Sequence, residues 1–356
     1  MRKLLSSTYL ALTLSIAVTC LWVFWGVIEM FHEGWYAPFE WLFFLLPAGV
    51  MFALTLIALR LPRVGAILFA AIGIGFGALV LWQYRPGGGR SAGMTLGNLL
   101  SWVPVWLFPV VIGILYYLGR GQPRRRIHYL AAIGAPALLG LALAIEPAYR
   151  LSQRVDDGYL GERFIQGNGV ALYWAPAGHG WNRSGGLTWN EIALYGRGGV
   201  GLTGKRFGMD GLCNGVADWT QHCATTEDMQ FYNVCLYLDR DGIQLMPTKQ
   251  GIWRMPTTDE LVRSLTRSNA NSRCAWNRVG GAPRMDATVR LSTVACEVKP
   301  DKETPLWDPR SRVIYYWAAD EASAGDAYIV VYNGEVWEVS KFTALGSRGY
   351  RCVRQK

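Results

Sequence analysis

Ionisable side chains are missing from most of the first 150 residues. Five apolar stretches run there almost back to back, at residues 9–28, 41–59, 64–82, 99–118 and 129–145, and none carries a charge near its middle. Each has about the 20 residues that cross a hydrocarbon core of roughly 30 Å. Ionisable groups at mid-membrane normally mark ion or proton routes. Their absence therefore favours an anchoring bundle over a transport pathway.

The chain also lacks a Cys-x-x-Cys pair, which zinc sites commonly contain. Six of its seven cysteines fall in the last 200 residues, and only His179 and His222 lie near them as further zinc ligands. An even number of cysteines in a folded segment is typical of disulfides in an oxidising compartment. We therefore expect disulfides and neither a metal nor a cofactor.

The loops between the apolar stretches differ in positive charge. Lysine and arginine number eight on the side that holds the N-terminus and residues 60–63 and 120–126, and four on the opposite side. Positive residues are retained on the cytoplasmic side of a membrane. With five spans, this bias predicts a cytoplasmic N-terminus and a periplasmic or extracellular C-terminal domain. Much of the net charge of +9 comes from arginines in the short loops between the apolar stretches, where membrane orientation explains them. We therefore expect no nucleic-acid partner.

The sequence divides into a bundle at residues 1–148, a polar connector at 149–165 and a folded domain at 166–356. Within that domain, residues 170–174 read as a strand. Thr257 and Glu260 have the spacing of a capping box and predict a helix start. Asn333-Gly334 lies between two runs of strand-forming residues and predicts a hairpin. These patterns indicate a domain of the α+β class.

One segment of this domain resembles a known signature. Residues 253–261, Trp-Arg-Met-Pro-Thr-Thr-Asp-Glu-Leu, are similar to the Trp-Arg-Leu-Pro-Thr-x-x-Glu-Leu motif of the bacterial C-type-lectin-like domain found at the C-terminus of collagen-like adhesins, the Lcl C-terminal domain. Further similar elements are Gly186-Leu187-Thr188-Trp189, the helix around Cys235, Tyr316-Trp317, and the closing Gly349-Tyr350-Arg351-Cys352-Val353-Arg354. The resemblance covers residues 165–356 and implies a lectin-like fold.

The resemblance also implies which cysteines pair. It places a bond between Cys235 and Cys352, which closes the domain near its ends. It is compatible with Cys213–Cys223 closing a short loop and Cys274–Cys296 closing a long one, although six cysteines permit fifteen pairings. The related formylglycine-generating enzymes use a cysteine pair that binds copper, but the Arg-Gly-Gly-Ser-Trp run of that family is absent here. We expect no enzymatic activity.

Calcium-dependent lectins use Glu-Pro-Asn or Gln-Pro-Asp with Trp-Asn-Asp, and none of these occurs in the chain. The domain is instead rich in tryptophan, most of which should be core. Trp276 lies between Arg273 and Arg278 in the presumed long loop, residues 268–312, and Trp307 lies near its end. We expect these four residues to be the ligand-binding candidates, because Trp and Arg dominate interface hot spots.

The sequence therefore predicts a membrane protein with a five-helix transmembrane bundle followed by an α+β, C-type-lectin-like extracytoplasmic domain. Its expected location is the bacterial cytoplasmic membrane, with the bilayer and a glycan or protein on the outer face as partners. The leading interpretation is a non-enzymatic recognition module. The alternative is an assembly subunit that binds other membrane subunits and uses its outer domain for docking. A sensor is less favoured, since the cytoplasmic loops carry no output domain.

Overall fold

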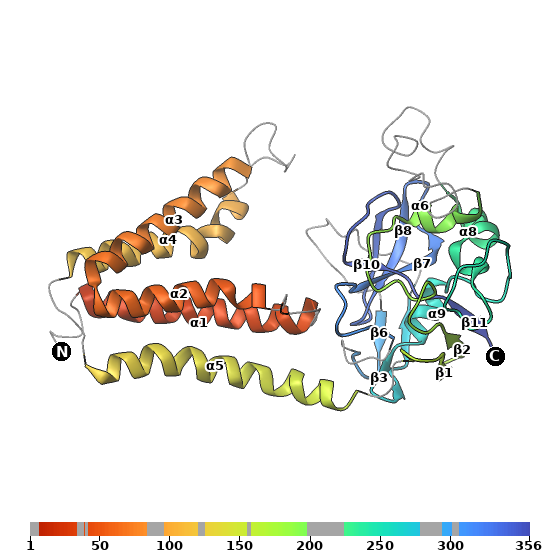
Figure 1. Ribbon diagram of the computed structural model, residues 1–356, viewed down its shortest axis with the longest axis horizontal. Helices are drawn as coiled ribbons and strands as arrows, with labels where there is room; N and C mark the ends of the chain where they lie inside the picture. Colours follow the sequence, from red (N-terminus) through yellow and green to blue (C-terminus); the bar gives the residue numbers. More distant parts are fainter. Residues whose placement is uncertain are drawn as a thin grey trace. The chain divides into compact units, whose positions relative to one another are not determined.

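The computed structural model describes residues 7–33, 39, 42–83, 96–119, 125–154, 158–197, 224–277, 294–300 and 306–356. The chain forms two compact units (Figure 1). The first comprises Met1–Phe31 and Phe39–Ala148, and the second comprises His32–Pro38 and Tyr149–Lys356. The first unit is helical, and the second is rich in short strands.

The N-terminal unit is built from long apolar helices. They are α1 (Ser7–Glu33), α2 (Leu42–Arg60), α3 (Pro62–Gln83), α4 (Leu96–Leu118) and α5 (Arg126–Ser152). Among the described residues, α1, α2, α3 and α5 are long and apolar enough to cross a membrane, whereas α4 contributes a shorter apolar segment, Val105–Leu118. Membrane insertion of this unit follows from these helices, and the fifth span stays a prediction.

Glycine allows α3 and α4 to pack closely. A Cβ at Gly73 would lie 2.5 Å from the carbonyl oxygen of Trp106, and one at Gly113 would lie 2.6 Å from that of Ala66. Gly77 also faces Trp106. Small residues at this spacing let helix backbones approach in membranes. The Gly73/Gly77 pair therefore serves packing within the bundle.

In its described residues, the C-terminal unit contains two sheets and two small ribbons. The first sheet has the order β1-β2-β11, and the second has the order β10-β7-β8-β9. In the first sheet the strands are β1 (Arg163–Gly167), β2 (Val170–Trp174) and β11 (Val353–Gln355), and in the second they are β7 (Tyr315–Glu321), β8 (Asp326–Val331), β9 (Val336–Ser340) and β10 (Arg348–Gly349). The ribbons pair β3 (Thr266–Arg267) with β4 (Ala270–Asn271), and β5 (Cys274–Trp276) with β6 (Val294–Cys296).

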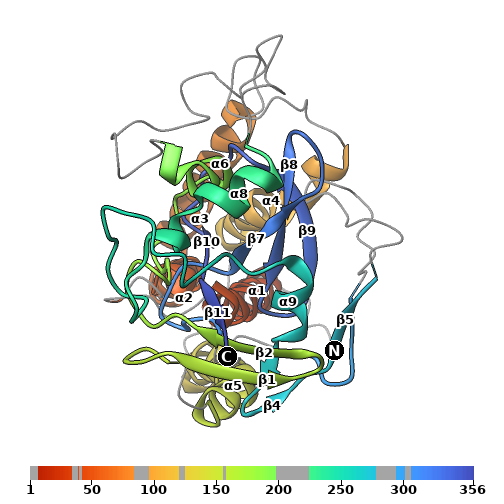
Figure 2. The ribbon, with the colours of Figure 1, turned by 90° about the vertical axis from the view of Figure 1, so that its right-hand side faces the viewer.

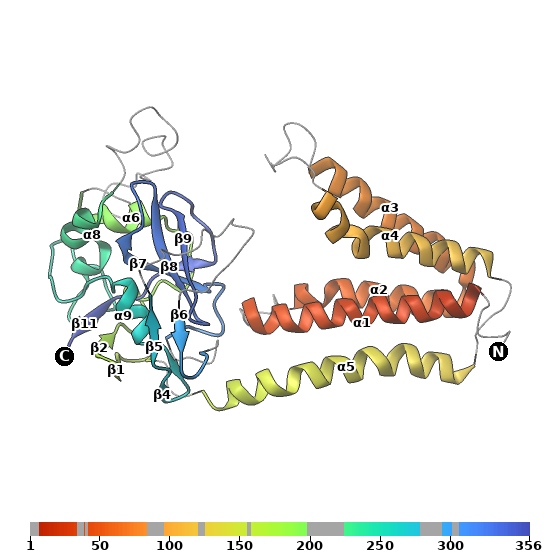
Figure 3. The ribbon, with the colours of Figure 1, turned by 180° about the vertical axis from the view of Figure 1, so that it is seen from behind.

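Both sheets bring together distant parts of the chain. Figure 2 shows β11 beside the β1–β2 hairpin, and Figure 3 shows β7, β8 and β9 from behind. Strand β1 begins at Arg163, within the segment expected to be a connector, because Phe164 and Ile165 pair with Tyr173 and Leu172. The folded domain thus starts earlier than polarity alone indicated.

Three short helices begin with a capping box. The predicted capping box is present at α9 (Thr258–Arg263), where Thr257 and Glu260 each bind the other's backbone amide. The same reciprocal pair occurs at α6 (Trp189–Ala193), from Thr188 and Glu191, and at α8 (Thr226–Tyr232), from Thr225 and Asp228. Two further helical turns are η1 (Tyr195–Arg197) and η2 (Val234–Tyr237). The capping pattern therefore signals more helices than the one that the sequence predicted.

The hairpin predicted at Asn333-Gly334 is formed by β8 and β9. Its loop has three residues, since Val331 N donates to Glu335 O at 2.8 Å and Gly334 N donates to Val331 O at 2.9 Å. Gly334 has a φ of 95°, the left-handed conformation that closes such a turn with a bulge. Glycine is thus required at the third loop position.

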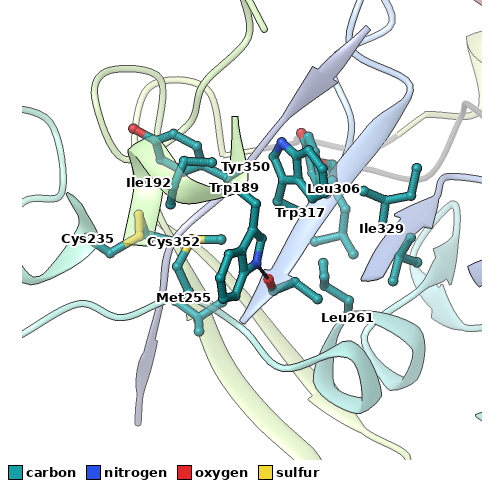
Figure 4. Close-up of a cluster of buried hydrophobic side chains, with 14 of the residues drawn as sticks. Trp189, Ile192, Cys235, Met255, Leu261, Leu306, Trp317, Ile329, Tyr350 and Cys352 are labelled. Carbon is teal, nitrogen blue, oxygen red and sulfur yellow. Dashed lines mark hydrogen bonds between the residues drawn. A yellow bond between two sulfur atoms is a disulfide. The ribbon is translucent and has the colours of Figure 1, made fainter. Parts of the chain in front are cut away.

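Tryptophan fills the core of this unit. Trp174, Trp189, Trp253 and Trp317 are fully buried. The Trp189 indole donates to the Ala318 carbonyl at 2.8 Å. Figure 4 shows Trp189 in a cluster that includes Met255, Leu261 and the Cys235–Cys352 disulfide. Nearby, the buried ammonium of Lys341 donates to Ala224 O, Ala324 O and the Glu321 carboxylate.

Candidate ligand-binding cleft

The structure describes three of the four residues proposed from sequence, and it excludes one of them, Trp307, from a surface site. Trp307 is fully buried and stacks on Tyr316, with ring centroids 4.2 Å apart. It is therefore part of the core and not available to an external ligand. Trp276 is half-buried on β5 and packs edge-to-face against Tyr328, with centroids 5.0 Å apart. Arg273 is exposed and pairs with Glu297 at 3.0 Å, and Arg278 lies outside the described residues.

Two of the expected disulfides are present. Cys235 bonds Cys352, with Cα atoms 5.7 Å apart and a sequence separation of 117. Cys274 bonds Cys296 across the β5–β6 ribbon. Cys213 and Cys223 lie outside the described residues. These crosslinks fit an oxidising compartment.

A cleft of about 620 Å³ lies where α8, η2, α9 and β11 meet. This volume is within the range of small-molecule binding sites. Its apolar lining includes Met229, Leu236, Met255 and Ile252, and its polar lining includes Gln230, Arg254, Glu260, Asp320, Arg354 and Gln355. The cleft therefore combines an apolar surface with several hydrogen-bonding groups.

The signature segment of residues 253–261 forms one wall of this cleft. Trp253 is buried, and its Nε1 donates to Asp239 O at 3.0 Å. The next residue, Arg254, reaches Glu260 with two hydrogen bonds of 2.7 and 2.5 Å. Glu260 also accepts from the Thr257 amide at 2.9 Å. One carboxylate thus caps α9 and fixes the arginine.

These contacts set the charge of Glu260. Burial opposes ionisation of its carboxyl group, but the hydrogen bonds from Arg254 and Thr257 outweigh burial and lower the pKa below its ordinary value. The carboxylate and the guanidinium are therefore both charged at neutral pH, and each neutralises the other.

Strand β11 forms the opposite wall. Arg354 donates to both carboxylate oxygens of Glu162, with bonds of 2.5 to 2.9 Å. Its guanidinium lies 4.3 Å from the centroid of the Tyr173 ring. The two walls are joined directly, because Arg254 and Val353 exchange both backbone hydrogen bonds at 2.9 Å. The Cys235–Cys352 bond additionally ties η2 to the residue that precedes β11. The cleft is therefore held by covalent and hydrogen-bonded links.

Asp320, near the end of β7, provides the remaining charge. Its Oδ2 accepts from the Thr258 amide at 2.6 Å, and no basic side chain among the described residues pairs with it. Gln230 and Gln355 likewise have no side-chain partner within the described ranges. Among the charged residues that line the cleft, Arg254 is paired with Glu260 and Arg354 with Glu162, so Asp320 is the one without a partner of opposite charge in the described part of the chain.

A second cleft, of about 500 Å³, lies beside residues 178–187 and Tyr350. Two of its polar side chains, those of Arg183 and Asn182, already have partners. Arg183 pairs with the nearly buried Asp308, and the Asn182 side chain accepts from the amides of Ser184 and Gly185. This second cleft therefore offers fewer unused groups than the first. Within the described part of the chain, no three His, Cys, Asp or Glu residues gather to hold a metal ion.

No family model, curated protein or solved structure matches the chain.

Sequence reasoning identified one wall of the cleft but not the cleft itself. Arg254, Thr257 and Glu260 were noticed as part of a motif, while ligand binding was assigned to the long loop. Arg354 also belongs to a noted motif, at the end of the chain. Asp320 and Gln230 carry no sequence signal, because only the fold brings the end of β7 next to α8 and α9.

Proposed function

We propose that the protein is a membrane-anchored recognition module with a lectin-like outer domain. The observation that carries this proposal is the cleft between α8, α9 and β11. Its walls are fixed by a disulfide, a backbone bridge and two arginine–carboxylate pairs, and it retains unused polar groups. Preorganised polar groups in a partly apolar cleft are typical of small-ligand sites.

The proposed location is a bacterial cytoplasmic membrane, with the N-terminus inside and the domain outside. The uneven distribution of lysine and arginine and the two disulfides support it. Labelling intact spheroplasts with an impermeant thiol reagent before and after reduction tests it. We expect labelling of the part-exposed Cys296 only after its bond to Cys274 is reduced; free thiols that react only after lysis would contradict this topology.

Binding by the cleft is tested with the full-length chain in a mild detergent and a glycan array. Gln230 is exposed on α8 and lines the cleft, so Gln230→Trp should fill it and abolish binding. Glu227→Trp, on the same helix but outside the lining, is the matched control and should bind as the wild type does. Loss of binding in Trp276→Ala, with binding retained in Gln230→Trp, would show that the ligand binds at the long loop and not in the cleft.

The alternative function, an assembly subunit, is favoured by α5. Its apolar side chains remain largely uncovered by α1 to α4, with Leu138, Leu141 and Ile145 each at least 66% exposed. Such a helix has room for a neighbouring subunit, although lipid also covers apolar helix surfaces. Co-purification in mild detergent separates the two functions, because a stoichiometric membrane partner would favour assembly.

A further inference from the structure

The proposed recognition function leaves open which chemical class of ligand enters the cleft, and the charges of the described residues narrow that choice. Arg254 makes a bidentate pair with Glu260, and Arg354 makes one with Glu162. A ligand anion would have to displace a carboxylate that already satisfies the guanidinium. Breaking such a pair leaves a partly desolvated charge without a partner, which is costly. The cleft therefore disfavours anionic ligands.

Asp320 has the opposite property. One carboxylate oxygen accepts from Thr258 N at 2.6 Å, while the other has no partner among the described residues. An ionised carboxylate can accept up to about four hydrogen bonds. A donor with a positive charge would use this capacity best, because charge-assisted hydrogen bonds are about twice as strong as neutral ones.

The rest of the lining indicates what should surround such a donor. The amides of Gln230 and Gln355 can each donate and accept, which suits neighbouring hydroxyl groups. Met229 and Met255 line the cleft but are buried, whereas Ile252 is 40% exposed and provides an apolar surface, which suits the C–H face of a sugar ring. The volume of about 620 Å³ is that of a site for a small ligand.

Taken together, these groups lead us to infer that the cleft binds an amino sugar with a free primary ammonium group, and that Asp320 binds the ammonium. This inference rests on the proposed recognition function and on the same cleft. It assigns the charge selectivity of the site to a residue outside the signature segment. Arg254 and Arg354 are then positioning residues that shape the walls.

Two sugars that differ only in this group provide the test. We would titrate the full-length chain in detergent with a glucosamine tetramer and with its fully N-acetylated counterpart. The free amine should bind at least about tenfold more tightly. Asp320→Asn keeps an acceptor for Thr258 N but loses the charge, and it should abolish the difference. Glu227→Gln removes a nearby exposed carboxylate outside the lining and should leave the difference unchanged.

Each result bears on the inference. Equal affinity for the two sugars, unaltered by Asp320→Asn, would overturn it while leaving recognition by the cleft intact. Failure of both sugars to bind would also overturn it, and failure of the whole glycan array would remove the proposed function as well. A lysine tetramer that binds as tightly as the glucosamine tetramer would show selectivity for charge alone and refute the sugar assignment. Melting temperatures of both variants exclude loss of folding as the cause.

Discussion

The Arg254–Glu260 pair should make a measurable contribution to the stability of the domain. In Glu260→Gln, the amide cannot accept both guanidinium bonds, so Arg254 loses its counter-charge and α9 keeps a weaker cap. The Glu260 side chain is 19% exposed and that of Arg254 is 34% exposed, so water compensates in part. Hydrogen bonds to charged groups contribute about 1.5–3 kcal/mol each, and we expect a net loss of about 2 kcal/mol.

Asp259 provides the control on the same helical turn. It pairs with Arg263 four residues later, and the two side chains are 34% and 39% exposed. Exposed pairs of this spacing contribute about 0.3–0.5 kcal/mol, so Asp259→Asn should cost little. For a domain of this size, each 1 kcal/mol shifts Tm by about 2–4 °C. Glu260→Gln should therefore lower Tm by about 4–8 °C, and Asp259→Asn by no more than about 2 °C.

The difference between wild type and Glu260→Gln should depend on pH. The pKa of Glu260 is lower in the folded state than its ordinary value of 4.5, so its contribution is complete above that value and declines as pH falls through the folded pKa. Thermal unfolding of the full chain in detergent, followed by near-ultraviolet circular dichroism at neutral pH and at pH of about 3.5, measures this. Equal shifts for the two variants, or a gap that does not narrow in acid, would refute the argument.

Three further changes test other parts of the structure. Replacing both cysteines of Cys235–Cys352 by serine should lower the free energy of unfolding by about 5 kcal/mol, and replacing those of Cys274–Cys296 should lower it by about 3.4 kcal/mol, because the first bond closes the longer loop. Denaturant unfolding compares the two variants, and the reverse order would contradict the loop argument. Lys341→Met should lower the free energy of unfolding by about 3 kcal/mol or more, because Glu321 and two carbonyl groups lose the hydrogen bonds from the Lys341 ammonium. A decrease in Tm of less than about 2 °C would count against this. Gly73→Leu should separate α3 from α4 and lower yield and thermal stability in detergent. Gly75→Leu should not, because a Cβ added at Gly75 would have no atom within 4 Å. Equal behaviour of the two variants would argue that α3 and α4 pack differently.

Local sequence patterns were sufficient to predict those elements whose structure depends on residues close together in the sequence. The capping box at Thr257 and Glu260, the strand at 170–174 and the hairpin at Asn333-Gly334 could all be predicted, because hydroxyl spacing, side-chain alternation and the need for a positive φ operate within a few residues. The apolar helices followed from length and composition alone. The same capping pattern at Thr188 and Thr225 was overlooked, although the signal was present.

Ligand-site residues could not be predicted in this way, because burial and pairing are properties of the folded chain. Trp276 and Trp307 are both tryptophans near charged residues in sequence, yet one is half-buried against Tyr328 and the other is enclosed in the core. Asp320 became a candidate only when β7, α8 and α9 were seen to meet at one cleft.

The sequence by itself determined the apolar helices and the places where short helices and the hairpin begin, because contacts within a few residues control these features. Only the tertiary structure decided which charges are neutralised and which stay available. Arg254 and Arg354 are both cations in the sequence, but their partners at Glu260 and Glu162 leave Asp320 as the charge that a ligand can use. Electrostatic pairing depends on distance in space, and sequence separation does not reveal it.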